Sequence, residues 1–376
     1  MPNPLSCVTP ALGLLGQSCS ILPATGTAVE ELLHPDRDEV EDILINRGAE
    51  EVTAFAETPE PSILDLYRPA PPLHRSEQHL FRFFIDGSLR TYHLATGIEG
   101  NRSFPIQLAQ IGGAVVERKD DGSVRLLRSR NKVLLLVPVG GRGLSSTVWQ
   151  RLLRLATPDK FFEPIDVAEP DVISGERERP DLRDKAGGKA RHRMHRLEID
   201  LIDVTKGRRN QENWVILDGA VKLDEFINVP HLIGVTKSFR KDPQFYFGRR
   251  ASERKDVTAI LAALPHEHRT VAFAAHGGQV AFWYVRLREQ KDLDYPLMGV
   301  IKVELPTPDR SPVPADLIDL LSRALVAERN VTPYGRDRRW HCHLYPIFIA
   351  EQAIKNQFYS QEVLLGAIRW PKQEEK

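Results

Sequence analysis

Two aspartates in this 376-residue chain share one local setting, a hydrophobic run followed by Asp-Gly. Asp86 closes the run FFID before Gly87, and Asp218 closes VILD before Gly219. Each run predicts a strand with a carboxylate at its end, and the glycine allows another backbone or a ligand to approach closely. One such pair is usually only a hairpin turn. Two pairs separated by a helix indicate a site for Mg²⁺ or Mn²⁺, which prefer carboxylate oxygens.

A third carboxylate lies on the helix predicted at about 190–204. The apolar face of this helix comprises Met194, Leu197 and Leu201. Glu198 is at the edge of that face, from which a side chain can reach over strand ends. A solvated flank is the ordinary position of a helical Glu, and Asp200 and Asp203 compete for the same role.

The elements that must position these residues form a sheet covered by helices. Strands are predicted at 80–85, 106–117, 123–137, 214–217, 232–236, 270–275, 280–288 and 298–305, with Asp121-Gly122 as the turn between the second and third. Helices are predicted at 146–156, 252–264, 314–328 and 346–356.

The chain divides into an extension and one large domain. Residues 1–76 are expected to be an N-terminal extension, with an amphipathic helix at 36–47 and a linker in which five prolines at 59–72 oppose regular structure. Residues 77–376 form the main domain. The charged, proline-containing stretch 158–193 is predicted to be a mobile insertion that leads into the helix.

The order of these motifs is that of the ribonuclease H fold: strand-Asp, two strands, helix-Glu, strand-Asp. The segments FIDGS, LEID, WVILDGAV, LIGVTKSFR and HLYPIFIAEQAIK, in this order over residues 80–365, resemble the NurA nucleases. The resemblance implies an α/β fold, a ribonuclease-H-like mixed sheet flanked by helices, with insertions and an N-terminal extension. It also implies that Asp86, Glu198 and Asp218 are catalytic and bind Mn²⁺ or Mg²⁺. Lys237 stands where the family motif has a lysine and is assigned as a fourth catalytic residue.

The last motif departs from that family. After Tyr345-Pro346 the family commonly has Ala followed by Asp or His, whereas this chain has Ala350-Glu351. Because a Glu oxygen can bind a hard cation, Glu351 is assigned as the fourth metal ligand. His341 and His343 are alternatives, although hard cations prefer oxygen and a histidine here is more often structural or in contact with phosphate.

Basic residues follow the Lys237 strand. Those assigned to nucleic-acid binding are Lys237, Arg240, Lys241, Arg249, Arg250, Arg338 and Arg339. The first five are interleaved with Phe239, Phe245, Tyr246 and Phe247, a mixture that suits single-stranded DNA because cations hold phosphates and aromatic faces stack on bases. An ordinary solvated loop with half of its aromatic residues in the core is an equal alternative.

These features predict a metal-dependent DNA nuclease that hydrolyses phosphodiesters with two cations. The resemblance further implies a homodimer that works with a HerA-type hexameric ATP-driven translocase in DNA-end processing or defence against foreign DNA. One alternative is a non-catalytic ribonuclease-H-like scaffold that binds nucleic acid or a motor. Another is an Argonaute-type slicer, for which the chain lacks room for guide-binding domains.

Composition also bears on other classes of protein, namely those that bind nucleic acid over their whole surface, span a membrane, are secreted, or depend on disulfides or zinc. Lys plus Arg and Asp plus Glu number 51 each, so attraction to nucleic acid must be local. The longest apolar run, 133–139, is too short to span a membrane. No secretory signal is expected, which predicts a cytoplasmic protein. Three cysteines without a CxxC pair argue against a disulfide framework and a zinc site.

Overall fold

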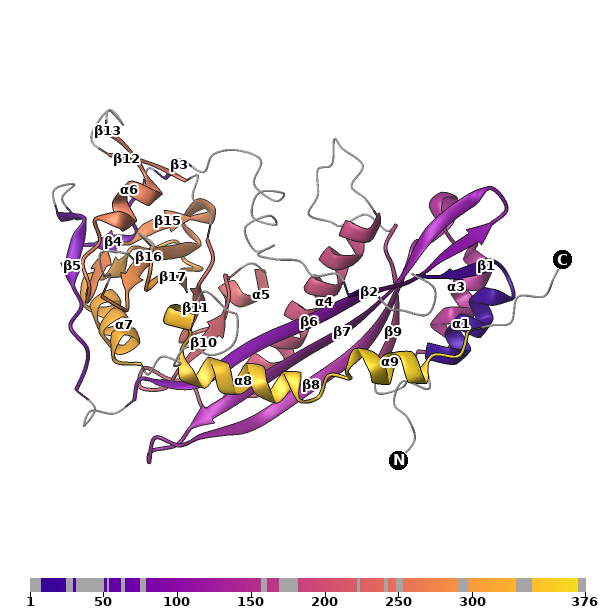
Figure 1. The fold of residues 1–376 in the computed structure, drawn as a ribbon. Helices are drawn as coiled ribbons and strands as arrows, with labels where there is room; N and C mark the ends of the chain where they lie inside the picture. Colours follow the sequence, from indigo (N-terminus) through magenta and orange to yellow (C-terminus); the bar gives the residue numbers. More distant parts are fainter. Residues whose placement is uncertain are drawn as a thin grey trace.

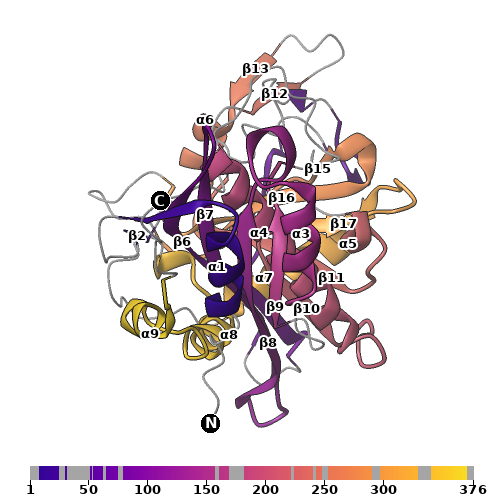
Figure 2. The ribbon, with the colours of Figure 1, turned by 90° about the vertical axis from the view of Figure 1, so that its right-hand side faces the viewer.

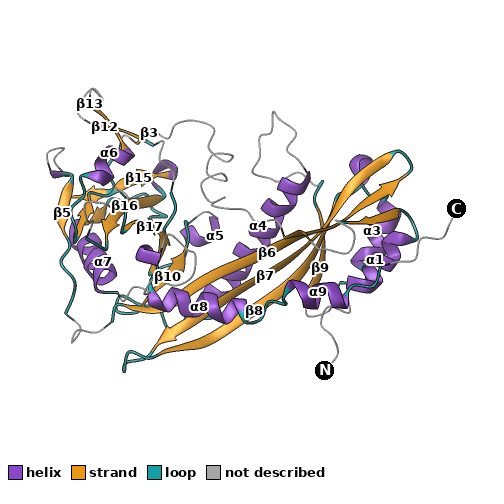
Figure 3. Cartoon of the chain, in the orientation of Figure 1, coloured by secondary structure: helices purple, strands orange, loops and turns teal. Residues whose placement is uncertain are grey.

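The structure is a computed structural model that describes residues 8–24, 30–31, 51–52, 54–61, 65–74, 79–156, 161–168, 182–221, 224–239, 243–247, 253–289, 297–328 and 340–370. The helix predicted at 36–47 lies outside these residues. The fold is mixed α/β, with a large, mostly antiparallel sheet flanked by helices (Figure 3).

Three long antiparallel strands form the middle of this sheet. They are β6 (Phe81–Glu99), β7 (Arg102–Arg118) and β8 (Val124–Val137), and they run diagonally across Figure 1. The turn predicted between β7 and β8 is confirmed: Gly122 has φ 78° and its N–H donates to the carbonyl of Lys119 at 2.9 Å. Glycine suits this left-handed conformation because it has no Cβ.

The first half of β6 has a parallel neighbour on its other edge. Here β10 (Trp214–Asp218) pairs with β6, and β11 (Leu232–Thr236) pairs in parallel with β10. Parallel neighbours such as β6 and β10 require a crossover connection. Here the connection includes α4 (Leu182–Asp203), which directly precedes β10 in the chain. The sheet then continues antiparallel through β17 (Val300–Pro306), β16 (Val280–Arg286), β14 (His268–Thr270) and β5 (Tyr67–Pro69).

Two helices cover opposite faces of the long strands, and neighbouring glycines on β7 identify them. A Cβ at Gly112 would lie 2.5 Å from Ile354 of α8 (Tyr345–Lys355), whereas a Cβ at Gly113 would lie 2.8 Å from Leu201 of α4. Since successive strand residues point to opposite faces, α4 and α8 lie on opposite sides of the sheet. Figure 2 shows the same arrangement, with α8 and α4 on either side of β7.

The far ends of the long strands have their own hydrophobic cluster. It joins Leu12 and Leu15 of α1 to Tyr92 and Leu94 of β6 and to Leu152 of the helix after β8. The elements at this end are α1 (Val8–Gly16), β1 (Ser20–Pro23), β2 (Glu30–Glu31), η3 (Gly140–Arg142), α3 (Ser146–Leu153), β9 (Phe162–Asp166) and α9 (Gln361–Ala367). Both β1 and β2 pair with the second half of β6.

At the other end, short elements surround β14 to β17. They are β3 (Glu51–Val52), β4 (Glu57–Thr58), α5 (Asp224–Ile227), β12 (Gln244–Phe247), β13 (Glu253–Asp256), α6 (Val257–Ala262), β15 (Phe273–Ala275), η4 (His276–Gly278), β18 (Val313–Pro314), α7 (Ala315–Ala327) and η5 (Trp340–Cys342). Here β12 lies between β13 and β3 in a three-stranded sheet, and β18 pairs with β4.

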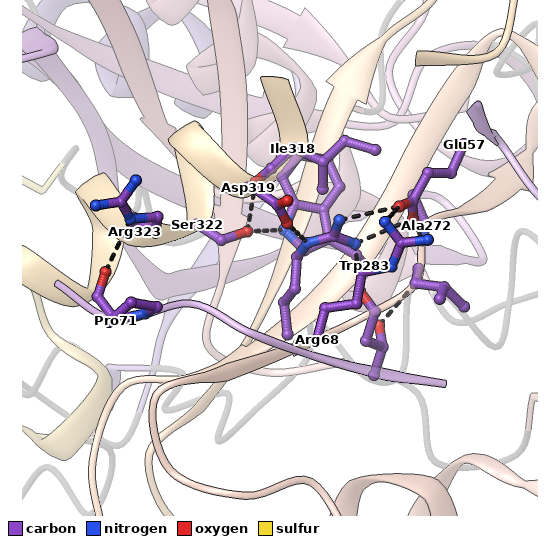
Figure 4. Close-up of polar contacts among 12 residues, drawn as sticks. Glu57, Arg68, Pro71, Ala272, Trp283, Ile318, Asp319, Ser322 and Arg323 are labelled. Atoms are coloured by element: carbon purple, nitrogen blue, oxygen red, sulfur yellow. Dashed lines mark hydrogen bonds and ion pairs between the residues drawn. The ribbon is translucent and has the colours of Figure 1, made fainter. Parts of the chain in front are cut away.

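A buried ion cluster ties the N-terminal residues to this end (Figure 4). The fully buried Arg269 donates to both carboxylate oxygens of Glu57, at 2.9 and 3.0 Å, and to Asp319 of α7 at 2.6 Å. Glu57 also contacts Arg68 at 2.9 Å and accepts from the N–H of Ala272. Because every partner is a charged or backbone group, the buried charges are compensated.

Three secondary-structure predictions are wrong in part. Within 158–193, β9 is a strand and α4 already begins at Leu182; within the proline-containing stretch 59–72, β5 forms. Both strands exist because a partner far along the chain is available: β8 for β9 and β14 for β5. The helix predicted at 252–264 begins with β13 and is helical only from Val257. The division at residue 76 stays a prediction.

Among the described helices, none has the length and apolar composition needed to cross a membrane.

Candidate functional site

Asp86 lies inside a strand, not at the end of one. The strand predicted at 80–85 continues to Glu99 because β7 pairs with it throughout, with Asp86 opposite Ala114 and Gly87 opposite Gly113. The expectation of a carboxylate at a strand end is therefore wrong for Asp86. The residue is 5% exposed.

Asp218 does end its strand, as predicted, and Gly219 follows with φ 127°. The parallel register aligns Leu217 with Ile85, so the next residue along each strand is one of the two aspartates. Asp86 and Asp218 are therefore neighbours across the β6–β10 pair. Their side chains share one face of the sheet because they hold equivalent positions in paired strands.

Lys237, the residue directly after β11, contacts this pair of aspartates. Its Nζ lies 2.6 Å from Oδ2 of Asp218, and both side chains are mostly buried, with 11% and 16% of their surface exposed. Val235 is the cross-strand partner of Asp218, and Lys237 follows it by two residues on the same face. A charge-assisted hydrogen bond of this kind holds both groups in place.

The same face is covered by α8, which carries Glu351. Ala114, opposite Asp86, packs in one hydrophobic cluster with Ala350 and Ile354 of α8. Glu351 is half-buried, contacts Lys355 at 2.5 Å, and its charge acts on Asp86. Of the alternatives to Glu351, His341 accepts through Nδ1 from the N–H of Gly299 at 2.9 Å.

Glu198 approaches from the opposite face. It is 1% exposed, and its Oε1 lies so close to the backbone of Gly87 that a Cβ there would be 2.4 Å away. The close approach expected beside the Asp-Gly glycine is thus made by a carboxylate of the protein. Its competitors are elsewhere: Asp200 is 54% exposed and pairs with Arg130, and Asp203 is exposed.

Glu198 is held by a neighbour on its own helix. Nδ1 of His195 lies 2.7 Å from Glu198 Oε2. The Nε2 atom of His195 is buried, and no hydrogen-bond partner for it is found within the described part of the chain.

The environment of Asp86 opposes its ionisation. Burial has the largest effect and raises the pKa of Asp86 well above its ordinary value, and the negative charge of Asp218 raises it further. Lys237 lowers the pKa, while Glu351 and then Glu198 raise it by smaller amounts. Three acidic side chains, from β10, α8 and α4, therefore act on the buried Asp86. A cation at this position would relieve the repulsion between them.

The donor set suits a hard divalent cation. Asp86, Asp218 and Glu351 supply oxygens on the α8 face, and Glu198 supplies oxygens beside Gly87, in space that a Cβ would fill. No three acidic, His or Cys side chains within the described ranges are already arranged as a metal-binding group. Instead, Asp218, Glu198 and Glu351 each contact a group of the protein itself, respectively Lys237, His195 and Lys355.

Most of the predicted nucleic-acid-binding residues cannot be placed. Arg240, Lys241, Arg249, Arg250, Arg338 and Arg339 lie outside the described residues. Of the aromatic residues between them, Phe239 is 7% exposed and Phe245 is fully buried, and both belong to a core cluster. These two rings are therefore part of the core and not stacking surfaces for bases.

Sequence reasoning missed Glu304, which positions the turn after Asp218. Glu304 is buried on β17, accepts from the N–H of Val221 at 2.7 Å and contacts Lys302 at 2.7 Å. Burial alone would raise the pKa of Glu304, but Lys302 and the Val221 N–H outweigh it, so the pKa is lowered. The only sequence signal was a charged pair inside an otherwise apolar strand.

Comparison of the chain with protein-family models gives no match, and comparison with curated proteins finds no similar sequence. The resemblance to NurA nucleases thus depends on the motifs of this sequence alone.

Proposed function

We propose that this chain is a divalent-metal-dependent DNA nuclease. The observation that carries the proposal is the burial of Asp86 among three other carboxylates, from Asp218, Glu351 and Glu198. Uncompensated like charges are costly in a protein interior, so such a site is better explained by a bound cation than by stability. Among the described residues, Lys237 and Lys355 supply one positive charge each to this group, at Asp218 and Glu351.

The topology supports a ribonuclease-H-like core of the NurA type. The strands follow the spatial order β8-β7-β6-β10-β11, with the first three antiparallel and the last two parallel to β6. The three acidic residues of that fold then correspond to Asp86 on the first strand, Glu198 on the crossover helix and Asp218 on the fourth strand. Because one scaffold serves many functions, the acidic site and not the fold carries the proposal.

In the proposed reaction, Asp86, Asp218 and Glu198 would hold the cations, with Glu351 as a further oxygen donor. Bound Mn²⁺ or Mg²⁺ ions supply activation of water and stabilisation of the leaving oxygen of a phosphodiester. Lys237 orients Asp218 and would offer a positive charge to a phosphate bound beside it. His195 orients Glu198 through Nδ1.

The proposal is tested with labelled single- and double-stranded DNA in Mn²⁺, Mg²⁺ or EDTA. Asp86→Asn, Asp218→Asn and Glu198→Gln should each abolish cleavage, because each removes a charged oxygen donor. Asp200→Asn is the matched control: it changes an exposed carboxylate two residues from Glu198 on the same helix and should retain the parent rate. Parent-level cleavage by Asp86→Asn or Asp218→Asn would refute the proposal.

As a further part of this proposal, the protein is cytoplasmic, forms a homodimer and works with a HerA-type hexameric ATPase in DNA-end processing or defence. Co-purification with a translocase from the same cell, followed by cleavage assays with and without ATP, tests the partnership. Cleavage that requires no guide strand would exclude an Argonaute-type slicer.

A non-catalytic scaffold is the second candidate, and one contact favours it. Lys237 satisfies Asp218 without any metal ion, as a structural ion pair would. The two candidates differ in their response to Mn²⁺, since only a metal enzyme should be stabilised by the ion and lose this stabilisation in Asp86→Asn.

A further inference from the structure

The helix that carries Glu198 has an unusual distribution of charge. Its N-terminal part, residues 182–196, contains six Lys or Arg side chains and one acidic residue, Asp184; residues 197–203 contain three acidic residues and no Lys or Arg. The helix dipole favours the reverse, with anions near the N-terminus and cations near the C-terminus. This charge distribution opposes helix stability, so the binding of an anionic ligand explains it better than stability does.

Four of the six cations form one stripe. Lys185, Lys189, Arg193 and Arg196 are spaced by four, four and three residues, which places them on one side of a helix. All four are half-buried or exposed, whereas the buried positions of α4 lie on the opposite side of the helix. We call this set the α4 basic stripe. It ends at Arg196, two residues before Glu198.

The two arginines of the stripe contact acidic residues of other elements. Arg193 contacts Glu163 of β9 at 3.2 Å, and Arg196 contacts Glu225 of α5. The side chains of Arg193 and Arg196 are 44% and 49% exposed. Exposed ion pairs contribute little net free energy, so a phosphate can compete for these guanidinium groups.

A glycine beside the stripe provides a second, independent observation. Gly188 lies in the interior of α4, where glycine lowers helix stability relative to alanine. A Cβ at Gly188 would meet no atom within 4 Å, so the packing of the described residues does not require glycine there. Gly188 follows Lys185 by three residues and therefore lies on the same side of the helix. An absent side chain on a basic surface allows a backbone from outside to approach.

The length of the stripe matches a short run of nucleotides. Eleven residues separate Lys185 from Arg196, which is about 16 Å along a helix axis and roughly five phosphates of one strand in a stacked duplex. The helix lies along the long strands (Figure 1). Arg196 and Glu198 are two residues apart and point to opposite sides of α4, so the stripe lies on the side of the helix away from the sheet.

We propose that the α4 basic stripe, with Gly188 beside it, binds the sugar-phosphate backbone of nucleic acid on the outer side of α4, outside the carboxylate site. This inference rests on the proposed nuclease function for the identity of the ligand. The contact is with phosphates, so it contributes affinity and position but no sequence preference.

The test measures binding of a labelled single-stranded oligonucleotide by fluorescence anisotropy in EDTA over a range of salt concentrations. Arg193→Gln should weaken binding several-fold at low salt and reduce the steepness of the log–log salt dependence by about 0.7, the effect of one lost phosphate contact. Arg102→Gln is the matched control, because Arg102 is 45% exposed and also pairs with a Glu, but lies at the far end of the sheet. It should bind as the parent does.

A second pair of variants separates binding from folding. Gly188→Ala should leave the thermal midpoint unchanged or raise it, because alanine favours helix, yet weaken oligonucleotide binding. Gly13→Ala makes the same change in α1, where a Cβ also meets nothing within 4 Å, and should leave binding unchanged.

Parent-like affinity and salt dependence in both Arg193→Gln and Gly188→Ala would overturn the inference, as would absence of oligonucleotide binding by the parent protein. Because the assay contains no divalent ion, it is independent of cleavage. If the variants lose oligonucleotide binding but the parent protein never cleaves DNA, the nuclease proposal is refuted and the inference about the stripe is retained. If the parent protein cleaves DNA but the variants bind normally, the nuclease proposal is retained and the inference about the stripe is refuted.

Discussion

Gly87→Ala is a stringent test of the site because the change adds one methyl group and removes no charge. The new Cβ would lie 2.4 Å from Oε1 of Glu198 and 3.0 Å from its Cδ. Ordinary contact begins at 3.4 Å, so the carboxylate must move by about 1 Å. A displacement of this size at a reacting centre lowers the rate by about 100-fold, or about 2.7 kcal/mol in activation free energy.

The assay compares Mn²⁺-dependent cleavage with the free energy of unfolding. Overpacking alone destabilises a protein by about 1–3 kcal/mol, so a control must overpack the same strand elsewhere. Gly97→Ala does this: its Cβ would lie 2.5 Å from the ring of Phe104, at the far end of β6. Both variants should lose comparable stability, but only Gly87→Ala should lose activity and most of the thermal stabilisation by Mn²⁺.

Two results would refute this reasoning. Cleavage at the parent rate by Gly87→Ala would mean that the position of Glu198 does not matter for the reaction. An equal loss of activity in Gly97→Ala would mean that the effect comes from general destabilisation of β6.

Three further predictions address neighbouring contacts. Lys237→Met removes the cation at Asp218 and should lower the free energy of unfolding in EDTA by about 2 kcal/mol, measured by urea denaturation; no change would show that the 2.6 Å contact contributes nothing. His195→Ala should weaken Mn²⁺ binding, followed by thermal shift, by at least about tenfold, while His195→Asn, which retains a donor near Nδ1, should restore much of it. Glu57→Gln should cost about 3 kcal/mol of stability at neutral pH. Although burial opposes ionisation of Glu57, Arg269 outweighs it and lowers the pKa, so the contribution of Glu57 is present above its ordinary value of 4.5 and is lost as pH falls through the lowered value. The variant should therefore show a flatter acid limb in unfolding curves, and an unchanged limb would contradict the assignment.

The local part of the site could be predicted from the sequence, and its long-range part could not. The strand that ends at Asp218 was recognisable because four apolar residues precede Asp-Gly. At Asp86 the same pattern misled, because pairing with β7 continues the strand, and the partner of Asp86 in that pairing is Ala114, 28 positions further along the chain. Local propensity contains no information about such a partner.

Helical spacing could have separated Glu198 from its competitors. Met194, Glu198 and Leu201 are related by four and three residues, so the carboxylate belongs to the buried face, whereas Asp200 is turned away from it. The role of His195 was open to the same argument, since it precedes Glu198 by three residues. Contacts such as Glu304 with the turn after Asp218 bring together residues more than 80 positions apart and have no local signature.

The strand β6 belongs to three hydrophobic clusters at once. Ile85 and Phe84 point into the two clusters beside β10 and β11, and Tyr92 belongs to the cluster of α1 and α3. If either end of the molecule unfolds, β6 no longer contributes its side chains to the hydrophobic clusters of the other end. Asp86 lies on β6 between these clusters. Heating should therefore produce a single cooperative endotherm, and a chain cut within this strand should yield no half that folds alone.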